Sequence, residues 1–218
     1  MYHIQKPILE KYFSKTRLEK IQVIGNCDFS EGLVLYGLNM KCGEKLYTAL
    51  SQFEIILRNA ISDQLVKDFG NIWFENKKLI FLKKHRDLIC EARASLETKG
   101  KEIDSCNITS NLTFGFWVNL FNPDYDKILW RVSLSKIFLD KEKPPARGLI
   151  RDRLKNFNRL RNRVSHCELI LNPLLPQYYA QLIETLSWIN SDIAKWLDEE
   201  INFSSLNFEK TKHALRPK

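Results

Sequence analysis

Hydrophobic residues recur at three- and four-residue steps along much of the chain, a spacing that places them on one face of an α-helix. The pattern predicts long helices over residues 46–65, 79–96, 149–164 and 178–200, and a shorter one over 124–138. Pro144 and Pro145 then interrupt any helix. No stretch alternates as a half-buried strand would. The sequence therefore predicts an all-α bundle of four main helices with short accessory helices.

The predicted bundle leaves both ends of the chain outside it. We expect an N-terminal accessory segment over residues 1–40, a helical domain over 41–201 and a basic tail over 202–218. A length of 218 residues fits one domain, and a hydrophobic content of 44% supports a packed core. An aromatic segment over 112–121 could stack nucleobases, but its density of large apolar side chains favours core packing.

Charge is unevenly distributed. The chain has 34 Lys and Arg against 26 Asp and Glu, a net +8 that favours an anionic partner such as nucleic acid or an acidic membrane surface. Residues 141–163 hold nine basic and two acidic residues, a net +7, and residues 77–101 hold a net +5. Two solvated helix faces would explain both runs. Because the first run ends three residues before His166, we favour a track for a polyanion.

The same reading predicts a cytoplasmic protein. No apolar run approaches the roughly 18 residues that a membrane span needs, and residues 1–10 lack the features of a signal peptide. The five cysteines are scattered without a C-x2-C pair, which predicts free thiols and no zinc site. We expect no membrane association, no metal site and no cofactor.

The helix over 149–164 carries an unusual cation. At 100° per residue, Arg161 falls near the centre of the apolar stripe, where its stem could pack while its head meets a carboxylate, or where it could meet a phosphate in a cleft. Asn162 and His166 are i,i+4 neighbours, so the amide could orient the imidazole. Arg161 and His166 diverge by about 140° on an ideal helix. Their convergence requires the helix to loosen near Ser165, or a second subunit.

Together these residues form an R-N-x3-H motif, and the chain resembles the Abi-like (abortive infection) family of the HEPN ribonuclease superfamily, whose signature is R-x4-6-H. Residues 53–61 (FEIILRNAI) resemble that family's E-x3-R-N helix, 112–118 (LTFGFWV) its aromatic segment, 160–168 (LRNRVSHCE) its LRNR-x2-H-x-E motif, and 188–196 its closing helix. The likeness spans residues 46–196. Cys167 and Leu169 depart from it, because that family often has His and Pro at these positions.

The resemblance implies a HEPN-like helical bundle and a metal-independent endoribonuclease that acts in antiphage defence or as a toxin of a toxin–antitoxin pair. The RNA 2′-OH would be the nucleophile. His166 would act as general base or acid, Arg161 would clamp the phosphate and Asn162 would orient the imidazole. Such nucleases are typically homodimers with a composite active site, and an RNA or protein antitoxin is a further expected partner.

Four more residues are predicted to support this site, namely Glu54, Arg58, Asn59 and Glu168. An ordinary helix ion pair between Glu54 and Arg58 is an equal alternative. The predicted RNA contacts are Arg151, Lys155, Arg159 and Arg163. Two other functions stay open. One is a non-catalytic HEPN-type module that holds a small RNA or a partner protein, and the other is a structural dimerisation protein without a nucleic-acid role.

Overall fold

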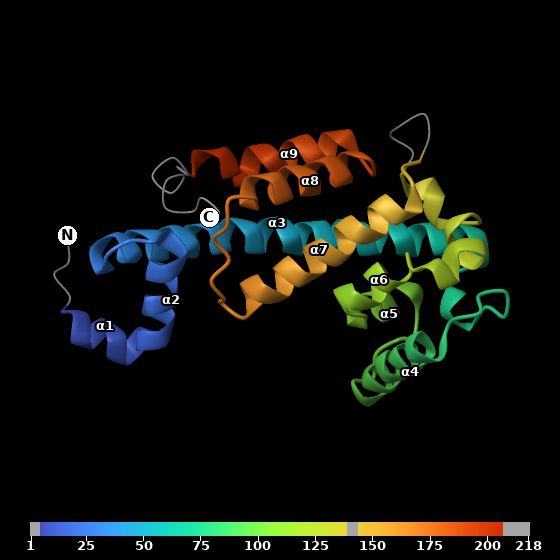
Figure 1. The fold of residues 1–218 in the computed structure, drawn as a ribbon. Coiled ribbons are helices and arrows are strands. Elements are labelled where there is room, and N and C mark those ends of the chain that lie inside the picture. The colour runs from blue at the N-terminus through green and yellow to red at the C-terminus, as the bar shows by residue number, and fades with distance from the viewer. Residues whose placement is uncertain (1–4, 139–143, 207–218) are drawn as a thin grey trace.

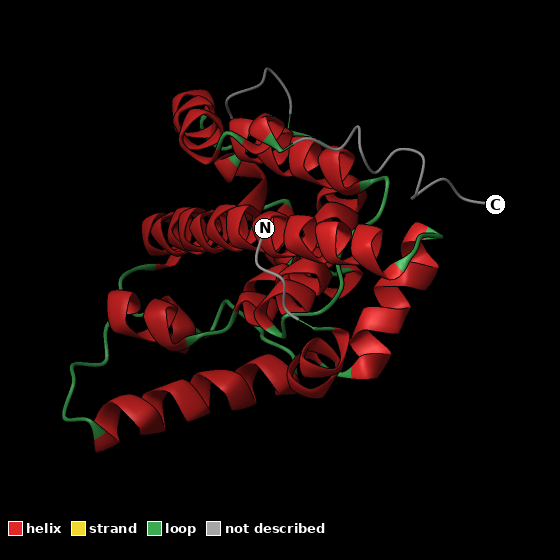
Figure 2. Ribbon diagram, turned by 90° about the vertical axis from the view of Figure 1, so that its left-hand side faces the viewer, coloured by secondary structure: helices red, strands yellow, loops and turns green. Residues whose placement is uncertain are grey.

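The computed structural model describes residues 5–138 and 144–206, and helix is the only regular structure within these ranges. The α-helices are α1 (Lys6–Phe13), α2 (Lys15–Gly25), α3 (Phe29–Phe69), α4 (Lys83–Thr98), α5 (Ser105–Asn111), α6 (Phe114–Asn119), α7 (Arg147–Ser165), α8 (Leu175–Ser187) and α9 (Ser191–Ile201). Short 3-10 or π turns lie at Trp73–Glu75, Pro123–Tyr125, Asp126–Trp130, Leu134–Ile137 and Phe203–Ser205. The predicted all-α class is confirmed (Figure 2).

The 41-residue helix α3 is the axis of the molecule (Figure 1). Asp28 begins it with a capping box: its side chain accepts from the Glu31 N–H at 2.9 Å, and its own N–H donates to the Glu31 carboxylate at 3.3 Å. Gly70, with φ of 90°, follows its last turn. The predicted helix 46–65 is therefore the middle of a longer one. This longer helix runs unbroken through residues 40 and 41, where we expected the accessory segment to end and the helical domain to begin.

Other helices pack along α3 according to their apolar faces. The α2 helix lies against its N-terminal part, α7 crosses its middle, α8 and α9 run along one side, and α5 and α6 cover another (Figure 1). In the centre of the core, the Phe53 ring meets those of Phe157 and Phe114 edge-on, with centroids 5.3 and 6.4 Å apart. Phe114, Phe116 and Trp117 are fully buried, so the aromatic segment packs in the core rather than offering rings to bases.

Two sequence predictions differ from the structure. The predicted helix 178–200 is two helices, because Asn190 caps α9 by accepting from the Ile193 N–H at 2.9 Å. Apolar residues keep a helical spacing across this turn and hide it. Residues 124–138 form 3-10 and π turns rather than one helix.

Membrane insertion requires a long apolar helix. None of the helices within residues 5–138 and 144–206 has the length and hydrophobicity needed to cross a bilayer.

Candidate functional site

Arg161 lies where α7 crosses α3. The α7 stripe of Ile150, Leu154, Phe157, Leu160 and Val164 is buried as predicted. Arg161 leaves the edge of this stripe, and its Nε lies 3.3 Å from Glu54 Oε2. The side chains are 39% and 14% exposed, so the pair sits at a half-open seam between the helices. The structure thus shows the first alternative, a packed stem with its head on a carboxylate.

A second arginine lies one turn further along α3. Of the two alternatives for Glu54, the structure shows the contact with Arg161 and not the ion pair with Arg58. The Arg58 Nε is buried, and no group within the described residues accepts its hydrogen. An unpartnered buried donor costs about 1–3 kcal/mol. Asn59, next on the helix, is exposed to solvent.

His166 is the C-cap of α7 and its side chain is exposed. Its backbone N–H still donates to the Asn162 carbonyl at 3.0 Å, so the residue keeps the helical register. The Asn162 amide oxygen accepts from Arg161 Nη1 at 3.4 Å rather than from the imidazole. Arg161 therefore reaches Glu54 on α3, and in the helical register His166 follows it by about 140° around α7.

The chain leaves α7 through a Schellman turn. The Cys167 N–H donates to the Val164 carbonyl at 2.9 Å, and the Glu168 N–H donates to the Arg163 carbonyl at 3.0 Å. Cys167 has φ of 52°, a left-handed conformation that favours glycine. Because these hydrogen bonds end the helix at a defined residue, His166 occupies a fixed place at its end.

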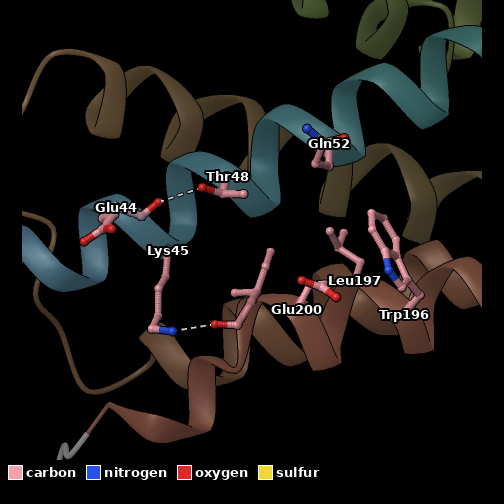
Figure 3. Close-up of a pocket in the computed structure, with 8 residues that line it drawn as sticks. Glu44, Lys45, Thr48, Gln52, Trp196, Leu197 and Glu200 are labelled. Carbon is pink, nitrogen blue, oxygen red and sulfur yellow. Dashed lines mark hydrogen bonds between the residues drawn. The ribbon is translucent and has the colours of Figure 1, made fainter.

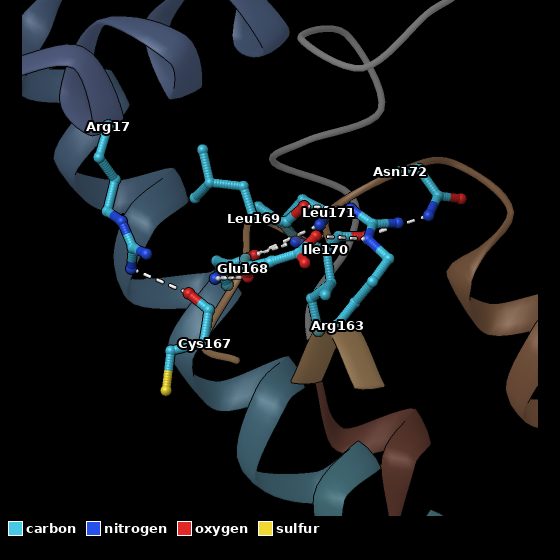
Figure 4. A network of polar contacts seen from close by, with 9 residues as sticks. Arg17, Arg163, Cys167, Glu168, Leu169, Ile170, Leu171 and Asn172 are labelled. Carbon is cyan, nitrogen blue, oxygen red and sulfur yellow. Dashed lines mark hydrogen bonds and ion pairs between the residues drawn. The ribbon is translucent and has the colours of Figure 1, made fainter. Parts of the chain in front are cut away.

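Two distant elements hold the segment that follows His166 (Figure 4). From α2, Arg17 Nη1 donates to the Cys167 carbonyl at 2.9 Å. From α3, the Asn39 side-chain oxygen accepts from the backbone N–H groups of Ile170 and Leu171 at 2.8 and 3.3 Å. Asn39 is only 7% exposed. Sequence reasoning missed both residues, although a polar residue on an apolar face of α3 was a usable signal for Asn39.

Arg163 joins the same network from α7. Its Nε lies 3.1 Å from Glu168 Oε2, and its Nη2 donates to the Leu169 carbonyl (Figure 4). Glu168 therefore pairs with Arg163 and not with Arg161 or the imidazole. Its contact stabilises the turn beyond His166.

Most of the basic run around α7 is neutralised by carboxylates. The pairs are Arg147–Asp126, Arg151–Asp152, Arg153–Glu184, Arg161–Glu54 and Arg163–Glu168. Lys141 and Lys143 lie outside the described residues. Lys155 and Arg159 form no ion pair within the described ranges. Of the predicted RNA contacts, these two are the cations that remain uncompensated.

The other described histidine is a buried structural residue. The Leu82 N–H donates to the Tyr125 hydroxyl at 3.0 Å, and that hydroxyl lies 2.8 Å from His85 Nδ1. The direction of this hydrogen bond is set by the tautomer of the imidazole, because the hydroxyl can both donate and accept. Burial lowers the pKa of His85 below its ordinary 6.5. Within residues 5–138 and 144–206, His166 is thus the histidine that solvent and a substrate can reach.

Two hollows lined by described residues open near these helices. A groove of about 410 Å³ between α3 and α9 is lined in part by Glu44, Lys45, Trp196 and Glu200 (Figure 3), and none of the predicted site residues lines it. A pocket of about 210 Å³ beside α7 includes Arg159 and Arg163. Within the described part of the chain, no group of three or more His, Cys, Asp or Glu side chains could hold a metal ion.

Comparisons of the chain with protein-family models, with curated proteins and with solved structures find no match. The resemblance to the Abi-like family rests on the sequence segments quoted above and stays a prediction.

Proposed function

We propose that this protein is a metal-independent endoribonuclease of the HEPN type, with a HEPN-like bundle, and that it acts in antiphage defence or as a toxin. The observation that carries the proposal is the exposed His166 at the rigid end of α7, in the same short motif as an Arg161 that a carboxylate holds in place. A reachable imidazole and an oriented guanidinium are the groups that metal-free RNA cleavage needs.

The reaction is an internal transesterification. A base removes the proton of the ribose 2′-OH, and the resulting oxygen attacks the adjacent phosphorus. An acid protonates the departing 5′-oxygen, which leaves a 2′,3′-cyclic phosphate on one product and a 5′-OH on the other. His166 serves as base or acid. Arg161 offers a permanently charged fork to the phosphate oxygens, where negative charge grows in the transition state.

A homodimer supplies what one subunit lacks. Each chain offers one reachable imidazole in its described part, and the helical register separates it from Arg161 of the same chain by about 140°. Two copies that bring their α7 ends to a common cleft would pair His166 of one subunit with Arg161 of the other.

The cleavage test uses full-length protein, single-stranded RNA and EDTA. We expect products that end in 2′,3′-cyclic phosphate, and loss of cleavage in His166→Ala and Arg161→Ala. Lys195→Ala, an exposed change on α9, is the matched control and should cleave like wild type. Equal cleavage by wild type and both site variants would indicate a contaminating nuclease and refute the assignment.

A mixing experiment tests the composite site. Co-expressed His166→Ala and Arg161→Ala chains form heterodimers in which one of the two sites has both intact residues. Partial recovery of cleavage supports the homodimer, whereas a mixture as inactive as its parents contradicts a shared site. Tight, salt-sensitive RNA binding without turnover, unaffected by His166→Ala, would instead favour the non-catalytic RNA-binding module.

The cellular role has its own test. Expression of the wild-type protein in bacteria without its antitoxin should arrest growth, and expression of His166→Ala should not. An RNA or protein antitoxin would be recovered as a molecule that suppresses this arrest. If cells that express the active nuclease grow normally, the defence or toxin role is refuted while the nuclease activity stands.

A further inference from the structure

The smaller pocket lies between α7 and the start of α8. Its lining residues are Asn156, Phe157, Arg159, Leu160, Arg163, Asn172 and Tyr178, and its volume is about 210 Å³. Phe157 and Leu160 are buried and give it an apolar floor, whereas the other five side chains form a polar rim. The volume is below the roughly 300–1,000 Å³ of drug-sized ligand sites, so one small unit fits.

The rim is cationic. Arg159 and Arg163 are one turn apart on the same face of α7, and no carboxylate lines the pocket. Arg163 is held by the Glu168 carboxylate and the Leu169 carbonyl, so its guanidinium is already oriented. Arg159 is exposed and forms no ion pair within residues 5–138 and 144–206. One fixed and one free guanidinium suit a phosphate group.

The remaining rim residues match a nucleobase. The Asn172 amide is fixed because its nitrogen donates to the Ile170 carbonyl at 3.0 Å and its oxygen accepts from the Leu174 N–H at 2.9 Å. Figure 4 shows Arg163 and Asn172 beside the same backbone segment. Asn156 offers a second carboxamide, and Tyr178 a half-buried ring. Carboxamides read base edges, and aromatic rings stack on base faces.

The pocket shares its side of α7 with His166. At 100° per residue, Arg159, Arg163 and His166 lie within about 60° of one another, whereas Arg161 is about 160° from Arg159. His166 follows Arg163 by three residues, or about 4.5 Å along the helix axis. A phosphodiester that leaves the pocket toward the end of α7 therefore reaches the imidazole.

We propose that this pocket binds one nucleotide of single-stranded RNA, with the base on Tyr178 and a phosphate between Arg159 and Arg163. The placement of that nucleotide next to the cleaved bond rests on the proposed ribonuclease function. Nucleotide binding itself does not.

The test measures binding to the full-length His166→Ala protein, which removes cleavage. The probes are uridine 3′-monophosphate, adenosine 3′-monophosphate, uridine, inorganic phosphate and a five-nucleotide single-stranded RNA. We expect both nucleotides to bind more tightly than uridine or phosphate alone. Tyr178→Leu should weaken nucleotide and RNA binding at least about fivefold, and Tyr178→Phe, which keeps the ring, should not.

The cation contacts have a matched control. Arg159→Gln should weaken nucleotide binding at least about fivefold, while Lys195→Gln removes an exposed cation of α9 outside the pocket and should change it less than twofold. Equal effects of these two changes, or nucleotide binding that is indifferent to Tyr178→Leu, would overturn the site. RNA binding that ignores both Arg159→Gln and Tyr178→Leu would overturn RNA as the occupant.

The two proposals fail in different ways. If the nucleotides bind as expected but wild-type protein cleaves no RNA, the pocket stands and the nuclease function fails. If wild type cleaves RNA through His166 while Arg159→Gln and Tyr178→Leu change neither binding nor cleavage, the nuclease stands and the pocket fails.

Discussion

Asn39 is a buried side chain on which the position of the segment after His166 depends. Asn39→Ala would leave the N–H groups of Ile170 and Leu171 without an acceptor, and both residues are buried. Each such donor costs about 1–3 kcal/mol. Because the Leu171 bond is long at 3.3 Å, we expect a total loss of about 2–4 kcal/mol. In a chain of this size that lowers Tm by about 4–16 °C.

Two measurements check this prediction. Thermal unfolding followed by circular dichroism gives the Tm shift, with Asn59→Ala as control because it makes the same change at an exposed position of α3. Hydrogen exchange gives the local effect, and the Ile170 and Leu171 amides should lose at least tenfold protection while amides in the middle of α3 keep theirs. A variant that melts within about 2 °C of wild type, with both amides still protected, would refute the reasoning.

Three other predictions follow from buried or half-buried groups. Burial lowers the pKa of His85, so the neutral ring contributes to the free energy of unfolding. This contribution should be complete above pH 6.5 and be lost as the pH drops through the lower folded-state pKa. Denaturant titrations of His85→Gln at the same pH values should not show this loss. Glu54→Gln should cost less than about 1 kcal/mol of stability, because the Glu54–Arg161 ion pair is partly exposed to solvent. It should nevertheless reduce RNA cleavage at least about tenfold, because Arg161 is no longer held in place. Equal cleavage by wild type and variant would show that Glu54 does not support the site. Burial also raises the pKa of Cys42 to about 12, so maleimide at pH 8 should modify the exposed Cys90, Cys106 and Cys167 quickly and Cys42 only after unfolding, as mass spectrometry would show.

The apolar periodicity of the sequence was enough to predict the all-α class and the buried face of α7, because the residues that repeat at helical spacing are those that the core buries. The same periodicity did not predict where helices begin and end, because capping side chains set these positions. Asn190 begins α9 with one side-chain hydrogen bond, although the apolar residues on both sides of it keep the spacing of one continuous helix. Asp28 and Glu31 likewise begin α3 well before its strongest apolar stretch.

The candidate site was harder to predict because its contacts join residues far apart in the sequence. Sequence spacing placed Arg161 near the core and offered Arg58 to Glu54, but no spacing connects the two helices, and the packing of α7 on α3 brings Arg161 to Glu54 instead. Asn39 stands out as a polar residue on an apolar face, but nothing local identifies residues 167–171 as the partners of Arg17 and Asn39. Net charge was also misleading, because carboxylates such as Glu184 come from other helices and neutralise much of the basic run.

The length and position of α3 have a consequence for synthesis on the ribosome. Its partners α7, α8 and α9 begin 78 or more residues after its last residue, Phe69. At about 5–20 residues per second, the apolar stripe of α3 remains without these partners for roughly 4–16 s after translation passes it. A nascent chain with 41 helical residues and an uncovered stripe is a substrate for chaperones. The folding of this protein is therefore coupled to the completion of its C-terminal half, and truncation before α7 should yield insoluble protein.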